Sequence, residues 1–171
     1  AIFDETVNAA VTDVITTKTA VFNKDFTGTT VTLNGGSGSA ITFVESVTAT
    51  DINIAGAGTI TLSNIAVETI TANITESSAG ATALVIADTV DGAHAAVTIS
   101  GTVAVDTVTI GATAKAGIAK FTNSVTTAAT IHGGNIGAED SLMEVVSATQ
   151  TGAVVLTVAG DGDAIFKLSG T

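Results

Sequence analysis

Apolar and polar residues alternate in short runs along the chain, and one five-residue phrase returns throughout it. The phrase is a large apolar residue, three mostly polar residues, and a second apolar residue. Its copies begin at Phe3, Phe22, Phe43, Leu62, Ile86, Ala104, Phe121, Leu142 and Phe166, the last one degenerate. Successive copies are 17 to 24 residues apart, which gives a period of about 20 residues. A fixed period of this size indicates a repeat architecture.

Between the phrases, apolar residues come in pairs that are two positions apart. In the clearest unit, Ile52 pairs with Ile54 and Ile60 with Leu62, and the Gly-rich segment 55–58 separates the two pairs. Residues at i and i+2 point to the same side of a β-strand. Each period therefore predicts short strands with one apolar side.

The phrase itself is better explained as a corner than as a strand. If Phe43 and Val47 lay in one strand, Glu45 would point to the same buried side as both. Burying an unpaired carboxylate is costly, so we expect the phrase to join two strands whose apolar ends both point inward. Three strands and three corners per period describe one coil of a parallel β-helix.

The fold prediction is therefore an all-β protein, a single parallel β-helix (β-solenoid) of about eight coils of roughly 20 residues, with residues 1–171 forming one domain. Only stacked neighbouring coils can bury the apolar side of each repeat. The alternative is an antiparallel β-sandwich, which also has short strands and regular turns. A sandwich favours two-residue Asn-Gly hairpins, and only Asn34-Gly35 fits that pattern. The recurring phrase favours the solenoid.

Composition narrows the classes of function. Five basic residues stand against 16 acidic ones, for a net charge of −11. Nucleic acids and anionic membrane surfaces both require a basic patch, so neither is an expected partner. Cys is absent, which excludes disulfides and thiolate chemistry. No apolar run reaches the roughly 18 residues of a membrane span, so membrane insertion is not expected.

The middle position of the phrase is the most interesting set of polar residues. It runs Glu5, Lys24, Glu45, Asn64, Asp88, Asp106, Asn123, Glu144. Stacking places Asp88 and Asp106 as direct neighbours, and paired carboxylates suit Ca²⁺, so this pair is the candidate metal site. The alternative is a solvated polar corner. The full repeat of calcium-binding β-rolls is absent, and Asp161-Gly162-Asp163 is only a fragment of such a loop.

Other chemistry has little support in the sequence. His94 and His132 are the two histidines, whereas a zinc site needs three or four ligands. There is no Gly-x-Ser-x-Gly elbow and no phosphate-binding loop. A sugar-binding groove usually stacks the sugar on aromatic rings, and the chain lacks Trp and Tyr. We therefore expect a protein that is not an enzyme, with no cofactor other than the candidate calcium ion.

The phrase, followed by an Ile-x-Ile pair, a Gly turn and Ala-Ile-Thr-Phe, resembles repeats of bacterial surface proteins. The resemblance is carried by Phe22 to Phe43, Phe43 to Leu62 and Phe121 to Ile131. It is similar to the Thr-, Ala-, Val- and Gly-rich repeats of autotransporter passengers of the rickettsial outer-membrane kind and of some S-layer proteins. The resemblance implies an extracellular protein displayed on the cell surface, where it forms a coat or adheres.

A solenoid that starts and stops in mid-repeat exposes strand edges that invite stacking. We therefore expect that the natural chain continues or that copies associate with one another, end to end or laterally. The predicted function is a non-enzymatic structural protein of the bacterial cell surface: an S-layer, filament or adhesin scaffold. The alternative is an adhesin or phage-fibre-like binding module, whose loops 76–80 and 134–141 would recognise a receptor or glycan.

Overall fold

The computed structural model describes residues 1–15, 18–63, 68–77, 80–87, 96–111, 116–133, 140–146, 148–158 and 162–170. Within these ranges the regular structure is entirely β-strand. The strands are β1 (Ile2–Phe3), β2 (Val7–Ile15), β3 (Thr19–Phe22), β4 (Phe26–Asn34), β5 (Ala40–Phe43), β6 (Val47–Thr48), β7 (Asp51–Ile54), β8 (Gly58–Ser63), β9 (Glu68–Ile70), β10 (Asn73–Glu76), β11 (Thr82–Ala87), β12 (Ala96–Ile99), β13 (Val103–Ala104), β14 (Thr107–Ile110), β15 (Ile118–Phe121), β16 (Ala128–Gly133), β17 (Ser141–Val146), β18 (Val154–Val158) and β19 (Ala164–Ser169).

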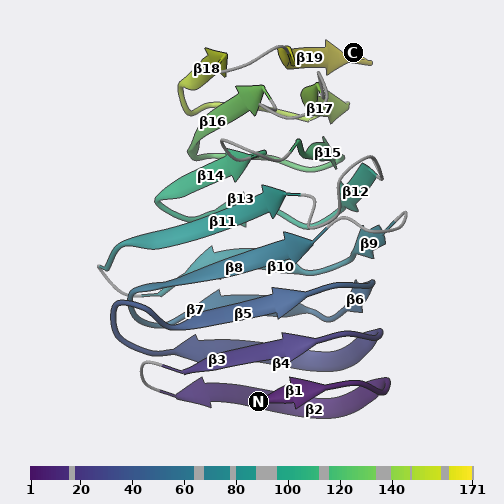
Figure 1. The fold of residues 1–171 in the computed structure, drawn as a ribbon, viewed down its shortest axis with the longest axis vertical. Coiled ribbons are helices and arrows are strands. Elements are labelled where there is room, and N and C mark those ends of the chain that lie inside the picture. The colour runs from purple at the N-terminus through teal and green to yellow at the C-terminus, as the bar shows by residue number, and fades with distance from the viewer. Residues whose placement is uncertain are drawn as a thin grey trace.

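The strands wind as a parallel β-solenoid, as predicted. One sheet has eight strands in the order β1-β3-β5-β8-β11-β14-β16-β18, and we call it the first face. Every neighbouring pair within it is parallel. Figure 1 shows the coils stacked along the long axis, with the N-terminus at one end and the C-terminus at the other. The antiparallel sandwich is therefore wrong.

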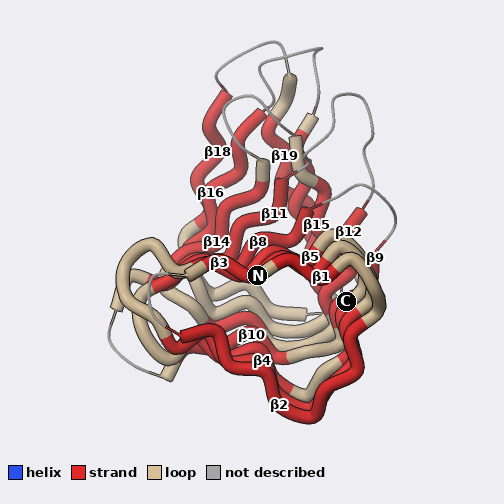
Figure 2. The backbone as a smooth tube through the Cα atoms, turned by 60° about the horizontal axis from the view of Figure 1, so that its bottom comes forward, coloured by secondary structure: helices blue, strands red, loops and turns tan. Residues whose placement is uncertain are grey.

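The second sheet, of 11 strands, covers two further faces. It bends because β4 is long enough to pair with two strands: its start pairs with β6, and Thr30–Leu33 pairs with β7. The second face continues from β6 through β9, β12, β15, β17 and β19, and the third face through β7, β10 and β13. In Figure 2 the three faces enclose a common interior, with loops at the corners.

The solenoid has about six turns, slightly fewer than the eight coils expected. The first face has eight strands, but the outermost two, β1 and β18, have a neighbouring coil on one side only. The third face is also incomplete toward the C-terminus, where the described pairing is reduced to the single bridges Val103↔Val125 and Val125↔Gln150. Coils at the two ends are therefore less enclosed than those between them.

Apolar side chains stack directly above one another inside the first face. We call this stack the first-face column, and its members in order are Phe3, Phe22, Phe43, Leu62, Ile86, Ile110, Ile131 and Leu156. The ring of Phe22 stacks on those of Phe3 and Phe43, with centroids 4.7 and 5.2 Å apart. From Phe22 to Ile131 every member is buried. The predicted superposition of Phe22, Phe43 and Leu62 is confirmed.

After Ile86 the sequence alignment of the phrase was wrong. Ala104 lies on the third face opposite Thr75. Phe121 lies on the second face, between Ile99 and Val145. The reason is physical: two inward-pointing apolar residues joined by three polar ones suit any corner of the prism, so the phrase marks a corner without saying which one.

The second face has a stack of its own, the second-face column, which is buried from Phe26 to Val145. It comprises Val7, Phe26, Val47, Ile70, Ile99, Phe121, Val145 and Leu168. Among the described residues, the two columns together hold all the buried Phe side chains and about half of the large core side chains. Fully burying one such side chain is worth about 1.5–3 kcal/mol, so each coil is stabilised mainly by the coils that cover it.

Two further features concern the predictions for loops and membranes. In the loop 76–80, Glu76, Ser77 and Gly80 are described and residues 78–79 lie outside the described residues, as do residues 134–139 of the second loop. No helix long and apolar enough to cross a membrane occurs in the described part of the chain. That the whole chain forms a single domain stays a prediction.

We predict that Phe43→Ala destabilises the protein by about 3–5 kcal/mol, because it opens a cavity beneath Leu62 in the middle of a packed column. Thr42 is the adjacent outward-facing residue of β5, and Thr42→Ala should cost less than about 1 kcal/mol. Urea unfolding followed by circular dichroism measures both. Equal losses for the two variants would contradict the column as the main source of stability.

Gly101 tests how closely the corners of neighbouring coils approach. A Cβ at this position would lie 1.9 Å from the carbonyl oxygen of Ala72, which belongs to the coil below. Gly101→Ala should therefore force a backbone shift and cost about 1–3 kcal/mol. A Cβ at Gly36 would meet no atom within 4 Å, so Gly36→Ala should change the free energy of unfolding by no more than about 0.5 kcal/mol. Equal urea midpoints for the two variants would rule out the tight corner.

Candidate functional site

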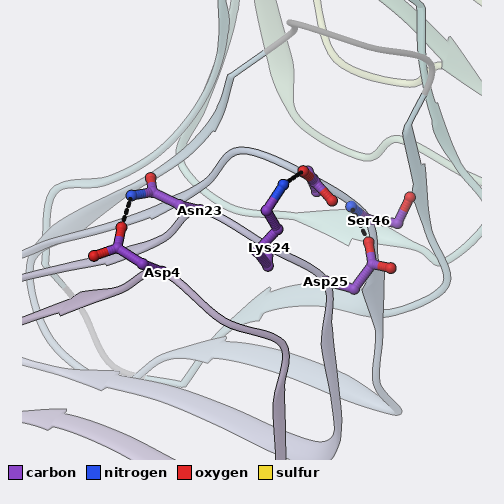
Figure 3. Close-up of polar contacts among 6 residues, drawn as sticks. Asp4, Asn23, Lys24, Asp25 and Ser46 are labelled. Atoms are coloured by element: carbon purple, nitrogen blue, oxygen red, sulfur yellow. Dashed lines mark hydrogen bonds and ion pairs between the residues drawn. The ribbon is translucent and has the colours of Figure 1, made fainter.

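Part of the predicted polar stack exists at the corner between the first and second faces. Lys24 and Glu45 lie in successive coils, and their side chains form an ion pair of 2.7 Å (Figure 3). The hydrogen bond to Glu45 and its charge raise the pKa of Lys24, and Asp25 and Glu5 add to the effect. The lysine thus separates two carboxylates that would otherwise be stacked neighbours. Its role here is structural.

The flanking residues of this corner form similar contacts from coil to coil (Figure 3). Asn23 donates a hydrogen bond to Asp4 at 2.7 Å. The backbone N–H of Ser46 donates to Asp25 at 3.2 Å. In the next coil the N–H of Thr69 donates to the hydroxyl of Ser46 at 3.2 Å. Each polar corner residue is therefore bonded to its equivalent above or below.

The corner between the second and third faces has an amide in the same role. Asn73 donates to Asp51 in the coil below at 3.2 Å and accepts from the N–H of Thr102 in the coil above at 3.0 Å. The side chain of Asn73 thus forms hydrogen bonds to the coils on both sides of its own. The arrangement holds the corners of three successive coils together.

Glu144 does not lie in the corner stack where the sequence placed it. It lies within β17, where its Cα neighbours are Lys120 of β15 and Lys167 of β19. Lys167 forms an ion pair with it at 2.8 Å, and Ser169 donates a hydrogen bond to it at 2.6 Å. The hydrogen bond from Lys167, followed by that from Ser169, lowers the pKa of Glu144. Equivalent side chains of stacked strands are close neighbours, so a carboxylate between two lysines gives attraction where three like charges would repel one another.

The candidate calcium residues are only partly described. Asp88 lies outside the described residues, so the proposed pair with Asp106 stays a prediction. Asp106 itself lies between β13 and β14, where its carboxylate accepts from the N–H of Thr82 at 3.0 Å and its own N–H donates to the Thr82 hydroxyl at 2.9 Å. The Thr82 hydroxyl in turn donates to Glu76. These contacts join the corners of successive coils.

The remaining chemistry-bearing residues do not converge. Glu76, Asp106 and Thr127 line a shallow open depression at the corner between the third and first faces. His132 lies in β16 and is half-buried, whereas His94 and Asp161 are outside the described residues. Across the described ranges there is no group of three or more His, Asp or Glu side chains that could hold a metal ion.

The first face is free of charge. None of its eight strands contains Asp, Glu, Lys or Arg, although the chain carries a net charge of −11. Its outward positions include Thr59 and Thr61 on β8, Ala83 and Val85 on β11, and His132 on β16. The strands of this face therefore carry no carboxylate, ammonium or guanidinium group.

The two ends of the solenoid are the surfaces that differ most from the rest. Among the residues whose exposure is described, the exposed large hydrophobic ones all lie in the end coils: Ile2, Phe3, Val155, Leu156, Ile165 and Leu168. Phe3 is 37% exposed at the N-terminal end, and at the C-terminal end Leu156 is 52% and Leu168 65% exposed. An apolar hollow lined by Val145, Ala148 and Leu168 adjoins them. The sequence predicts unpaired strand edges at the ends, but Leu156 and Leu168 could not be named from it, because after Ile86 the phrase no longer marks the same corner.

No protein-family model, no curated protein and no solved structure matches the chain. The functional interpretation therefore depends on the geometry described above, in which the end coils are the candidate functional site.

Glu144 gives a pH-dependent test of the charged stack. Its pKa is lowered in the folded protein, so its contribution to stability is present above the unfolded-state pKa of about 4.3 and is lost as the pH falls through the lower folded value. We predict that wild type melts at a higher temperature than Glu144→Gln at pH 7 and that the difference shrinks toward pH 3. Melting temperatures recorded between pH 7 and pH 3 measure this difference. A difference that grows on acidification would contradict the ion pair.

Proposed function

We propose that the chain is a non-enzymatic structural protein of the bacterial cell surface that assembles by stacking its coils against further copies, as part of an S-layer, a filament or an adhesin scaffold. The observation that carries the proposal is the distribution of exposed apolar side chains. They lie at the two ends of the rod, while the second and third faces carry polar and charged residues. Apolar area that is removed from water contributes about 25 cal/mol per Å².

Several features support a structural role. The polar residues at the corners bond to the neighbouring coil, which ties them into the rod. The repeat resembles those of autotransporter passengers and S-layer proteins, and that resemblance supports an extracellular location. A strongly acidic surface keeps rods apart along their charged flanks.

The alternative function, recognition of a receptor or glycan by the loops 76–80 and 134–141, stays a prediction, and so does side-by-side contact between rods. The loops contain residues outside the described ranges, and no contact of the described residues favours a particular ligand.

We predict that the purified chain forms rods longer than one molecule, visible by negative-stain electron microscopy and by sedimentation velocity at increasing concentration. Leu156→Glu should shorten or abolish them, because a carboxylate would have to be buried at the junction. The matched control is Thr98→Glu, which places the same charge on the second face beside Lys120 and should assemble like wild type. Parallel samples with calcium and with a chelator show whether the ion contributes.

Two outcomes would contradict the proposal. One is a wild-type chain that stays monomeric at every concentration in both buffers. The other is a Leu156→Glu variant that assembles as readily as Thr98→Glu. Surface display is tested separately by protease treatment of intact cells, which should remove the protein while cytoplasmic proteins survive.

A further inference from the structure

Both apolar columns run the full length of the rod, and each ends at residues that are not fully covered: Phe3, Leu156 and Leu168 are exposed and Val7 is half-buried. The first-face column begins at Phe3 and ends at Leu156. The second-face column begins at Val7 and ends at Leu168. Inside the rod, neighbouring coils stack through these columns. The N-terminal end exposes one side of that stacking contact, and the C-terminal end exposes the other side.

We propose that copies join head to tail in one fixed register. The first coil of one copy covers the last coil of another, with β1 on β18 and the start of β2 on β19. Phe3 then lies over Leu156 and Val7 over Leu168, so both columns continue across the junction with the spacing of about 4.8 Å that separates parallel strands. This inference rests on the proposed function, because it specifies the contact through which the chain assembles.

The order of the faces favours a head-to-tail junction over a head-to-head one. Translation along the axis places every face on its own continuation and keeps the strands parallel. Turning one copy over, with the first faces still aligned, places the second face of one copy on the third face of the other. The second-face column would then face the third face, whose buried residues Val31, Ile52 and Ile74 stack in a register of their own.

The charges at the two ends are complementary. The first coil carries the exposed carboxylates Asp4 and Glu5, and the last coil carries Lys167, whose side chain is 57% exposed. With Leu168 over Val7, Lys167 lies over Thr6, next to Glu5. A head-to-tail junction therefore brings opposite charges together across the interface, which favours association.

Cysteine pairs can test this register without interference, because the chain has no native Cys. Continuing the strand register places Ile2 of one copy opposite Val155 of the next, both on the outer side of the first face. Adjacent parallel strands lie about 4.8 Å apart, within the Cα separation that a disulfide spans. Oxidation of the double variant Ile2→Cys/Val155→Cys should therefore give a ladder of dimers, trimers and higher oligomers on a non-reducing denaturing gel.

Three control variants define the geometry. Ile2→Cys and Val155→Cys alone should give no ladder and little dimer, because like ends do not meet. In Ile2→Cys/Thr157→Cys the second thiol is two residues further along β18, and crosslinking should be at least about fivefold slower, since the Cα atoms are then too far apart for a disulfide. Size-exclusion chromatography of the reduced variants confirms that each is folded.

The outcomes separate this inference from the proposed function. A wild-type chain that stays monomeric by sedimentation overturns both. A wild-type chain that polymerises while Ile2→Cys alone dimerises as fast as the double variant, or while Val155→Cys and Thr157→Cys crosslink equally well with Ile2→Cys, overturns only the head-to-tail register. A ladder confined to Ile2→Cys/Val155→Cys supports both.

Discussion

Stacking of one coil on the next is the interaction on which the whole structure depends. The buried side chains of Phe22, Phe43 and Leu62 touch their equivalents above and below, so each coil is completed by its neighbours and not by a core of its own. A coil with only one neighbour leaves its apolar column open to water, as Leu156 and Leu168 show. The exposed ends are therefore a direct consequence of how the interior is built.

The same stacking imposes an electrostatic constraint. Equivalent residues in successive coils lie about 4.8 Å apart, so a repeated carboxylate would repel its copies along the rod. The chain avoids this by alternation. Lys24 stands beside Glu45, Glu144 stands between Lys120 and Lys167, and Asn73 bonds to coils on both sides. The chain is acidic overall, but from coil to coil its carboxylates alternate with lysines or amides. The polar corners thereby stabilise the stacking of the coils.

The architecture could be predicted from the sequence because two of its features can be read directly along the chain: the length of the repeat, and the alternation of inward and outward residues within a strand. Apolar pairs at i and i+2 identified the strands, and the position of Glu45 within its phrase identified the corner. Assigning each phrase to a particular corner required three dimensions. Seven residues separate the third face from the first between Ile52 and Ile60, but only three separate them between the equivalent residues Val125 and Ala129. The first-to-second corner changes in the opposite sense. The total length of a coil changes proportionally less than that of either corner, so the period alone could not show that Phe121 lies on another face.

The predicted site depended on that same alignment. The candidate pair of Asp88 and Asp106 assumes that both lie at one corner and stays a prediction, since Asp88 is outside the described residues; the described contacts of Asp106 are with Thr82. The end coils were expected to be open on general grounds, but Leu156 and Leu168 could be named only after the strand register was known. Hydrophobicity alone does not distinguish a covered Leu from an uncovered one.

The corner between the second and third faces has a consequence for engineering. Only three residues separate Ile70 from Ile74, Ile99 from Val103 and Phe121 from Val125, and at Gly101 the backbones of two coils almost touch. The equivalent corners from Phe26 to Val31 and from Val47 to Ile52 have four residues, so length varies far more at the other two edges of the prism. A peptide epitope spliced near Gly36 would be displayed to the outside without disturbing the winding, whereas the same graft at Gly101 would push two coils apart. As a scaffold, the rod should thus tolerate inserted peptides at the third-to-first and first-to-second corners, but not at the corner between the second and third faces.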